Sequence, residues 1–547
     1  MKIKLIEFFF EDSSVSKKSI ILLTILAGLF AGVFVFIINR TALVVYKNVT
    51  YEFPYILFFM TTTTILYLTK KESFIRSIKV TEELVRKKRV QLIHKIRNTD
   101  LDFLEKTGNS EIYVRLTDNI NIISQSIPIF ITSLDSLFTV AGVCIYCAFM
   151  SFESLICMLF YVLLTIIIFY SKYNQAQKIF AIADKKESEY SETLNGMLFG
   201  FKQIKVNHTK NDKLFEDITD IGRESETLKA EGIINIFLVS FFTDTLYFVM
   251  LGLFIFVFPF LFGLNQAILP NIIIAILFIY SPLSYIYKFA PHIVMSNLAI
   301  EKINKLEMQL DEVNIKYSQP EIILNDFNKI ELSSASFSYI DQENQRTFKL
   351  GPVDLSIHKG DILFIVGGNG SGKSTLLKLL IGLYKTDDPG YILLDDTKLS
   401  IERYPEYGEL FSIIFTDFHL FRKLYGIEHV DQNELNQLIQ KMSLEKKTKY
   451  VNGKFTNIDL STGQKKRLAY IAAIMEDKPI YIFDEWAADQ DPEFREYFYT
   501  TIIQELRGSG KTVIAVTHDD RYFEYSDYLI KLDDGKIIER IDHSKHQ

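Results

Sequence analysis

The chain has 547 residues, which is long enough for two or three domains. Its 60 Lys and Arg against 67 Asp and Glu give a net charge of −7. This charge argues against a nucleic-acid partner, because such a partner requires a basic face. Hydrophobic residues make up 48% of the chain, and nearly all the long apolar runs lie before residue 300, so we predict a membrane half followed by a soluble half.

The N-terminal stretch MKIKLIEFFFEDSSVSKK combines a short apolar patch with Glu7 and further acids. It lacks the small-residue cleavage site of a signal peptide before the next apolar run. We therefore predict an amphipathic helix that lies on the cytoplasmic surface of the membrane.

Six later segments are apolar over about the 20 residues that a spanning helix needs. The second carries Thr61 to Thr64, whose hydroxyl groups can bond back to the helix backbone. The predicted spans are residues 19–38, 53–69, 127–150, 154–170, 233–262 and 270–290.

The segments between these spans differ in length and charge. Spans three and four are joined by SFE, and spans five and six by GLNQAIL. The joins after spans two and four are long and charged, and residues 70–121 hold twelve Lys or Arg. The positive-inside rule therefore places both long joins, and both termini, in the cytoplasm. We expect the long joins to be helical extensions of the spans.

Two acids lie inside the predicted spans, Asp135 and Asp244. Because a lone acid is costly in lipid, both should face the bundle interior or a wet cavity. They either hydrogen-bond to other helices or bind a polar or cationic substrate group. The three cysteines, Cys144, Cys147 and Cys157, fall in apolar runs and are interpreted as small hydrophobic residues.

The soluble half begins after residues 313–328, which contain turn formers and Pro320 and are predicted to form a linker. From Glu331 onward, short apolar strands alternate with helical stretches, which is typical of an α/β domain.

The stretch GGNGSGKST, residues 367–375, follows the strand-like ILFIV and precedes the helix-like TLLKLLIGL. In this context G-x-x-x-x-G-K-S predicts a phosphate loop, whose backbone N–H groups and following helix N-terminus bind phosphates. Lys373 is expected to reach the β- and γ-phosphates, and the Ser374 hydroxyl to bind Mg²⁺. The predicted nucleotide-binding residues of this loop are Gly367, Gly368, Asn369, Gly370, Ser371, Gly372, Lys373, Ser374 and Thr375.

A second motif is PIYIFDEWAADQDPEF, residues 479–494. IYIF predicts a buried strand, and Asp484 at its end matches the second magnesium ligand of phosphate-loop NTPases. Glu485 follows, where a carboxylate can orient or deprotonate the attacking water. The pair predicts hydrolysis of Mg-ATP.

The stretch LSTGQ, residues 460–464, followed by KKR, resembles the signature motif L-S-G-G-Q of ABC ATPases, with Thr462 for the first glycine. This resemblance implies that Ser461, Gly463 and Gln464 contact ATP. It also implies that Tyr339, 28 residues ahead of Gly367, stacks on adenine.

Two further matches to the ABC ATPases follow in the family's order. His518, after the strand TVIAVT, corresponds to the switch histidine that contacts the γ-phosphate, and we predict that it shares the catalytic role with Glu485. Asp491 matches the acid that closes the loop after the catalytic glutamate.

The membrane half resembles that of ABC exporters, which carry six spans ahead of the ATPase on one chain. LDFLEKTGNSEIYVRLTDNI, beginning at Leu101, resembles the first segment that docks such exporters on their ATPase domains, and LNGMLFGFKQIKVNHTK, beginning at Leu194, the approach to the second. The expected organisation is a six-span α-helical transmembrane domain with cytoplasmic extensions (1–312), a linker (313–328) and an α/β phosphate-loop ABC nucleotide-binding domain (329–547).

Two departures from the common family pattern are informative. The chain has FTD at residues 415–417 where most members have Val-Pro-Gln-Asp, and DEWAADQDP where most have D-E-P-T-S-A-L-D-P. Together with GGNGSGKST, they resemble the YojI-like cyclic-peptide exporters, which export microcins, lipopeptides or siderophore precursors. Thr416 replaces the glutamine that normally touches magnesium and water and relays the substrate signal. We predict that Thr416 belongs to the magnesium site, although its shorter hydroxyl would reach the ion only through water. Either Asp417 takes over this relay or the relay is weaker.

Trp486, the chain's only tryptophan, replaces the usual proline after the catalytic glutamate. Its ring either fills a gap beside the strand end or packs against a partner ATPase domain when two such domains close.

The resemblance implies a homodimer, because the signature Ser461 of one copy closes on phosphates held by Lys373 of the other. The leading functional hypothesis is ATP-driven export of a small or cyclic peptide by alternating access, from the cytoplasm across a bacterial inner membrane. One alternative is a lipid or lipid-linked glycan flippase. Another is an ATP-binding regulator that does not transport.

Overall fold

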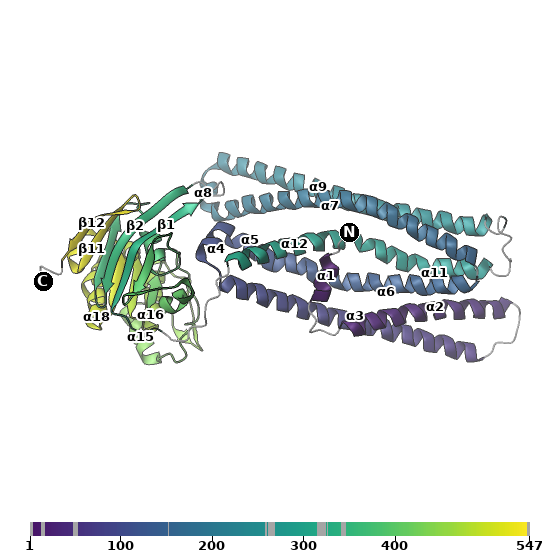
Figure 1. The fold of residues 1–547 in the computed structure, drawn as a ribbon, viewed down its shortest axis with the longest axis horizontal. Coiled ribbons are helices and arrows are strands. Elements are labelled where there is room, and N and C mark those ends of the chain that lie inside the picture. Colours follow the sequence, from purple (N-terminus) through teal and green to yellow (C-terminus); the bar gives the residue numbers. More distant parts are fainter. Residues whose placement is uncertain are drawn as a thin grey trace. The chain divides into compact units, whose positions relative to one another are not determined.

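The computed structural model describes residues 4–11, 17–46, 53–150, 152–257, 260, 269–313, 324, 326–340 and 346–543. They form two compact units (Figure 1). The first comprises Met1–Arg97 and Thr107–Glu312, and the second comprises Asn98–Lys106 and Val313–Gln547, within the described ranges.

The first unit is entirely helical in its described part, and its long helices run lengthwise beside one another (Figure 1). Its elements are α1 (Lys4–Glu11), α2 (Lys18–Tyr46), α3 (Phe53–Arg97), α5 (Asn109–Val114), the π-helical turn η1 (Arg115–Asn119), α6 (Ile120–Met150), α7 (Phe152–Phe199), α8 (Phe201–Val206), α9 (His208–Phe256), α11 (Leu269–Lys288) and α12 (Ala290–Val313).

Four stretches of the described helices are long and apolar enough to cross a membrane: Lys18–Ala42, Asn109–Met150, His208–Phe256 and Leu269–Val313. The second and fourth predicted spans lie in α3 and α7, which are helical throughout. Residues 258, 259, 261 and 262 of the fifth predicted span, much of the GLNQAIL turn, Ser151 of SFE and most of the 313–328 linker lie outside the described residues. Six spans therefore remain a prediction.

The threonine run in α3 shows how polar side chains are accommodated in an apolar helix. The hydroxyl groups of Thr62, Thr63 and Thr64 each donate a 2.8 Å hydrogen bond to the carbonyl four residues earlier. These bonds satisfy the hydroxyl groups within the helix, as expected from the sequence.

Helices α2 and α6 cross at glycines. A Cβ on Gly28 would lie 2.4 Å from the Phe138 carbonyl oxygen, and one on Gly142 would lie 2.1 Å from the Gly28 carbonyl oxygen. Only a residue without a side chain permits this approach, which is how membrane helices gain packing without a hydrophobic driving force.

Asp135 of α6 pairs with Lys70 of α3, at 3.1 Å between Oδ2 and Nζ. The contact supports the helix-to-helix interpretation of this acid, since its charge is compensated by a cation on a neighbouring helix. Asp244 lies in α9 and is half-buried.

The N-terminal segment forms helix α1, as predicted. Phe9 is fully buried, with its ring centroid 6.0 Å from that of Phe130 in α6, and Lys4 pairs with Glu301 of α12 at 3.0 Å. The position of α1 at the membrane surface remains a prediction.

The second unit is α/β. Its strands are β1 (Lys329–Ile340), β2 (Arg346–His358), β3 (Ile362–Gly367), β4 (Tyr391–Leu394), β5 (Thr397–Lys398), β6 (Phe411–Ile414), β7 (Tyr450–Val451), β8 (Lys454–Phe455), β9 (Ile480–Asp484), β10 (Thr512–Val516), β11 (Tyr528–Asp533) and β12 (Lys536–Asp542). Its α-helices are α4 (Leu101–Thr107), α13 (Lys373–Leu380), α14 (Tyr404–Gly408), α15 (Gln432–Lys441), α16 (Thr462–Met475), α17 (Pro492–Tyr497) and α18 (Ile503–Gly508), joined by short 3₁₀ and π turns.

The larger sheet has the strand order β12-β11-β3-β10-β9-β6, in which all neighbours except β11 and β12 are parallel. Strands β9 and β10 are buried over their whole length, as a parallel sheet covered on both faces requires. Because β3, β10, β9 and β6 run parallel, the turns that follow their carboxyl ends meet at one edge of the sheet.

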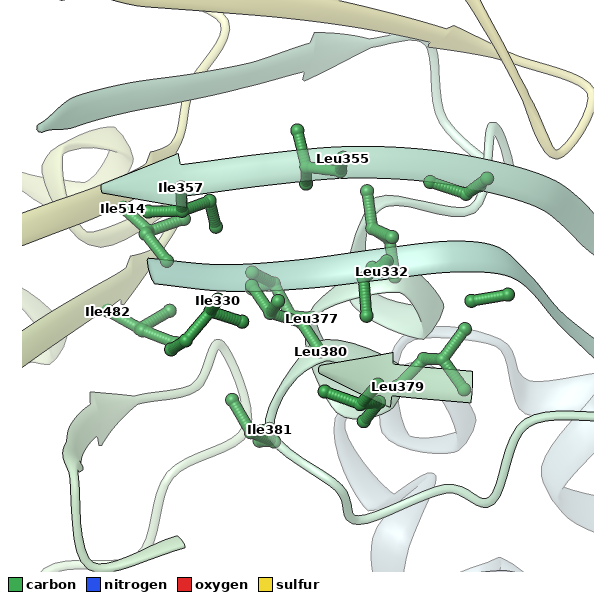
Figure 2. Close-up of a cluster of buried hydrophobic side chains, with 14 of the residues drawn as sticks. Ile330, Leu332, Leu355, Ile357, Leu377, Leu379, Leu380, Ile381, Ile482 and Ile514 are labelled. Carbon is green, nitrogen blue, oxygen red and sulfur yellow. The ribbon is translucent and has the colours of Figure 1, made fainter. Parts of the chain in front are cut away.

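An antiparallel sheet, β2-β1-β4-β5, packs on α13. Figure 2 shows this core, in which Leu332 of β1 and Leu355 of β2 lie with Leu377 and Leu380 of α13. Helix α13 carries the end of the predicted phosphate loop, so this core fixes the loop's position.

Candidate functional site

The predicted nucleotide-site residues converge at the carboxyl ends of the parallel strands. The phosphate loop follows β3, Glu485 follows β9, His518 comes two residues after β10 and Thr416 comes two residues after β6. These four strands are neighbours in the order β3-β10-β9-β6. Ligands of open α/β sheets bind at this edge.

The phosphate loop has the backbone geometry that its glycines predict. Gly370 and Gly372 have φ values of 78° and 101°, which residues with a Cβ rarely adopt. Gly372 is the N-cap of α13. The Lys373 Nζ atom donates to the carbonyl oxygens of Gly367 and Gly368 at 2.9 and 3.0 Å, which keeps the buried ammonium group inside the loop.

The residues predicted to hold Mg²⁺ also meet. The Ser374 hydroxyl lies 3.4 Å from Asp484 Oδ2, and the buried Oδ1 atom of Asp484 has no hydrogen-bond partner among the described residues. Burial raises the pKa of Asp484 above its usual range, and a bound divalent cation would favour the charged carboxylate. A hydroxyl and a carboxylate oxygen fit magnesium, which takes oxygen ligands and keeps several waters.

Thr416 lies beside this pair, but its hydroxyl donates to the main-chain carbonyl of Asp484 at 3.3 Å. Its role as a magnesium ligand remains a prediction.

Glu485 and His518 are in direct contact, with 3.2 Å between Glu485 Oε1 and His518 Nε2. The Glu485 carboxylate is 31% exposed and the His518 ring 46%, so both side chains are accessible to solvent and ligand. The backbone N–H of Glu485 donates to the carbonyl of Val516 at 3.2 Å, which joins the ends of β9 and β10. A carboxylate next to an imidazole at a strand end suits the activation of water.

Tyr339, expected to stack on adenine, is half-buried, and its hydroxyl contacts Tyr384 at 3.0 Å and Thr375 at 3.4 Å. The Tyr384 hydroxyl donates its only proton to Glu105 Oε2. Because Tyr384 has no second proton to donate, the Tyr339 hydroxyl is the donor in the contact between the two tyrosines. Burial and then the Glu105 contact raise the pKa of Tyr384, which keeps this hydroxyl protonated.

The segment predicted to dock, which begins at Leu101, is divided: its residues up to Lys106 belong to the ATPase unit, and those from Thr107 belong to the first unit. Its docking role remains a prediction. Leu101 packs against the hydrophobic core that contains Leu332 and Leu377. Asp100 pairs with Lys385 at 2.5 Å, and Glu105 pairs with Lys378 of α13 at 2.7 Å. The segment from Leu194 lies in the first unit, and its docking role remains a prediction.

The signature stretch forms the start of α16. Ser461 is the N-cap and forms a capping box with Gln464, whose Oε1 atom accepts from the Ser461 backbone N–H at 3.3 Å. Ser461 and Thr462 are exposed. A Cβ on Gly463 would lie 2.7 Å from the Asp489 carbonyl oxygen, so Gly463 is required where Thr462 is tolerated.

Asp491 is engaged within its own chain. Its carboxylate caps α17 by accepting from the Phe494 backbone N–H at 2.9 Å, and it pairs with Arg467 at 2.6 Å. The Phe494 hydrogen bond, supported by Arg467, holds its pKa below the usual range. Contact of Asp491 with nucleotide remains a prediction.

The position of Trp486 contradicts its interpretation as a residue that packs against a partner domain. Its ring is only 1% exposed and lies 4.7 Å from Phe498 by ring centroids, and its Nε1 atom donates to the Lys466 carbonyl oxygen at 2.8 Å. The reading in which the ring leaves water as a partner domain closes is wrong, because the ring is already buried inside its own unit.

Two contacts beside the candidate site could not be predicted from the sequence. Lys466, in the KKR run, is 2% exposed and donates to the Glu485 carbonyl oxygen at 2.6 Å. Tyr384 carries no motif, and its contact with Glu105 spans 279 positions of the chain.

Two family models match the chain. The ABC transporter model matches residues 350–488, and the ABC transporter transmembrane region model matches residues 4–210. The chain is 29% identical to the ATP-binding protein SyrD of Pseudomonas syringae pv. syringae over 538 residues, which cover 94% of this chain and 93% of that protein.

Shorter matches include the energy-coupling factor transporter ATP-binding protein EcfA1 of Oenococcus oeni, with 32% identity over 38% of this chain and 77% of that protein. The ATP-dependent lipid A-core flippase of Saccharophagus degradans matches with 29% identity over 39% of this chain and 38% of that protein. The structure of a bacterial Atm1-family ABC exporter with ATP bound superposes with a TM-score of 0.80 at 14% identity, over 98% of this chain and 96% of that one.

Proposed function

The chain belongs to the ABC transporter family, with an exporter-type membrane domain fused to an ATPase domain that couples ATP hydrolysis to transport, and on this premise we propose that it exports a small or cyclic peptide. The observation that carries the proposal is similarity to SyrD along almost the whole of both chains. The FTD and DEWAADQDP departures, which resemble the cyclic-peptide exporters, support the same substrate class.

In the proposed hydrolysis of ATP, each site residue has its own role. Lys373 and the N–H groups of the phosphate loop bind the phosphates, and the Ser374 hydroxyl and Asp484 carboxylate hold Mg²⁺. When bound, the magnesium ion neutralises charge on the phosphates. Glu485 takes the proton of the attacking water, and His518, 3.2 Å away, orients that carboxylate and contacts the γ-phosphate.

The proposed assembly is a two-fold homodimer with two identical ATP sites. Ser461, exposed at the start of α16, completes the site of the other copy. ATP clamps the two ATPase domains together, and hydrolysis releases them, so that the transport pathway alternates between the cytoplasm and the outside of a bacterial inner membrane. ATP can drive this cycle only by binding the two states with different affinity.

The flippase alternative is favoured by the lipid A-core flippase relatives, but each of the three matches covers only 39% of this chain. The non-transporting regulator is disfavoured because Glu485 and His518 are both present and in contact.

The test uses the purified protein in proteoliposomes. Transporters with outward-facing ATPase domains should accumulate a labelled cyclic lipopeptide in the lumen when Mg-ATP is added, and the Glu485→Gln variant should not. Flipping of a fluorescent phospholipid is measured in the same vesicles. ATP-dependent lipid flipping without peptide uptake, across a panel of linear and cyclic peptides, would replace the proposal with the flippase.

A further inference from the structure

Glu485 has an unusual backbone. Its φ and ψ angles are 51° and 36°, in the left-handed region, although it is not a glycine. This conformation is unfavourable for a residue with a Cβ and persists only where surrounding contacts enforce it. The contacts that enforce it should therefore determine where the Glu485 carboxylate points.

Lys466 supplies one such contact. Its ammonium group lies inside the unit, donates to the Glu485 carbonyl oxygen at 2.6 Å and pairs with the Asp489 carboxylate at 2.7 Å. Glu485 is the N-cap of the 3₁₀ turn η3 (Trp486–Asp489), and Asp489 is its last residue. One buried cation thus binds both ends of the turn that follows the catalytic carboxylate, which is a strong contact because the donor is charged and buried.

Trp486 supplies the reciprocal contact. While the Lys466 side chain binds the main chain of the turn, the Trp486 indole N–H binds the main-chain carbonyl of Lys466 at 2.8 Å. The ring is held by Phe498 at 4.7 Å, Tyr470 at 5.9 Å and Phe483 at 6.3 Å between centroids. Rotation of the indole away from α16 would leave its N–H buried without a partner, which is costly.

A third contact continues the attachment along the same loop. Gln490 donates to the Gly463 carbonyl oxygen at 3.1 Å and accepts from Arg467 at 2.9 Å. The loop after Glu485 is therefore bound to the first turns of α16, the helix that begins at the signature Ser461.

We propose that Lys466 and Trp486 form a reciprocal clamp that holds the backbone of Glu485, and that both are positioning residues for ATP hydrolysis. The proposal rests on the role of Glu485 in the proposed function. It also deepens that function: Ser461 serves the ATP bound by the other copy, so the clamp transmits the position of α16 at one ATP site to the catalytic carboxylate of the other.

The experiment measures the ATP dependence of hydrolysis and the ATP bound per protomer on the full-length protein. Lys466→Met should lower kcat by about ten-fold while the KM for ATP stays within about two-fold, because the loss falls on the catalytic step rather than on binding. Lys466→Arg, which keeps a buried cationic donor, should recover part of the rate. Lys465→Met, which removes the neighbouring half-buried lysine of α16, is the matched control.

Trp486→Phe is the milder variant, because it keeps an aromatic ring among its neighbours while it removes the N–H donor and part of the ring volume. It should lower kcat by about three-fold. This variant keeps the proposal testable if Lys466→Met, which removes the buried cation that contacts the Glu485 carbonyl oxygen and the exposed Asp489 carboxylate, fails to fold.

A double-mutant cycle separates positioning from general stabilisation. In the Glu485→Gln background, Lys466→Met should cause no further loss in the single-turnover rate, because it acts only through Glu485. An undiminished kcat in both Lys466→Met and Trp486→Phe, or an equal loss with and without Glu485, would overturn the clamp. Retention of most activity by Glu485→Gln alone would instead overturn the role of Glu485 in the proposed function.

Discussion

The two ends of the candidate ATP site are held by different kinds of contact. At the hydrolytic end, Glu485 is fixed by buried groups of its own ATPase unit, Lys466 and Trp486. At the other end, where Tyr339 is proposed to stack on adenine (the adenine end), the Tyr339 hydroxyl connects through Tyr384 to Glu105, whose segment interrupts the membrane unit in the sequence.

The difference separates two tasks. Buried, fully partnered groups make the hydrolytic geometry an intrinsic property of the ATPase unit. Partly exposed ion pairs such as Glu105 with Lys378, at 39% and 21% exposure, are individually weak and form and break at little cost. We therefore propose that the Tyr339 end, rather than the hydrolytic end, is where the membrane domain influences ATP binding.

The largest loss of ATP turnover should come from replacing the proposed catalytic carboxylate of Glu485. Glu485→Gln should lower turnover by at least about 100-fold, the usual contribution of a general base, while ATP still binds. The variant should accumulate an ATP-clamped dimer, detectable by size-exclusion chromatography of the isolated ATPase domain or by cross-linking of the full-length protein. Substantial turnover by the purified variant would assign water activation to another residue.

Mixing two inactive variants tests whether each ATP site needs residues from a second copy of the chain. Lys373→Ala and Ser461→Arg homodimers each lack an intact composite site, whereas their heterodimer has one intact and one doubly damaged site. Mixing should restore roughly a quarter of the wild-type ATPase activity, since about half the dimers are mixed and each has one working site.

Heterodimers isolated with two different affinity tags sharpen this comparison. Vanadate should trap nucleotide in one site of each heterodimer. Failure to trap any would contradict completion of the site in trans.

Removing a contact at the adenine end should weaken the stimulation of ATP hydrolysis by peptide while basal hydrolysis continues. Glu105→Ala removes the acceptor of Tyr384 and the partner of Lys378, so peptide stimulation of ATPase activity should fall about five-fold, the lower range of typical coupling energies. Basal hydrolysis should change by less than about two-fold. Lys106→Ala, which removes the neighbouring lysine that pairs with Asp102, is the control. Unchanged stimulation in Glu105→Ala would remove this segment from the coupling route.

The smallest effect is expected from the tryptophan. Because Trp486 is already buried, its emission maximum should lie to the blue before nucleotide is added and should stay fixed when Mg-ATP clamps Glu485→Gln. As the chain has no other tryptophan, excitation near the red edge reports this ring alone. A blue shift on clamping would mean that the ring is exposed in the resting protein.

The convergence of the residues proposed to contact phosphate, magnesium and water could be predicted from the sequence, because their motifs lie at the ends of buried strands. Lys373, Asp484 and Glu485 stand in local motifs whose strands are apolar and short. The parallel register then brings the strand ends together without further information.

The contacts behind these residues could not be predicted in the same way. Lys466 lies in a run of three basic residues, which ordinarily indicates a solvated helix face. Its burial depends on the carbonyl of Glu485 and the carboxylate of Asp489, which a later segment of the chain supplies. Trp486 was ambiguous because an aromatic residue beside a strand end fits a core or an interface equally well.

The membrane unit shows a similar division. Apolar length and composition predicted helices that the described parts of the six expected spans do form, but the pairing of Lys70 with Asp135 depends on how α3 and α6 pack. The close approach of α2 to α6 depends on Gly28 and Gly142, which periodicity does not distinguish from other small residues.

The most direct test of the difference between the two ends compares Lys466→Met with Tyr384→Phe in one ATP titration of the full-length protein. Tyr384→Phe keeps the ring stacked on Phe337, at 4.2 Å, and removes only the hydroxyl that joins Tyr339 to Glu105. The account predicts that Lys466→Met lowers kcat by about ten-fold with little change in the KM for ATP, whereas Tyr384→Phe raises this KM by about three-fold with little change in kcat. Two variants that change the same kinetic constant in the same direction would contradict the account.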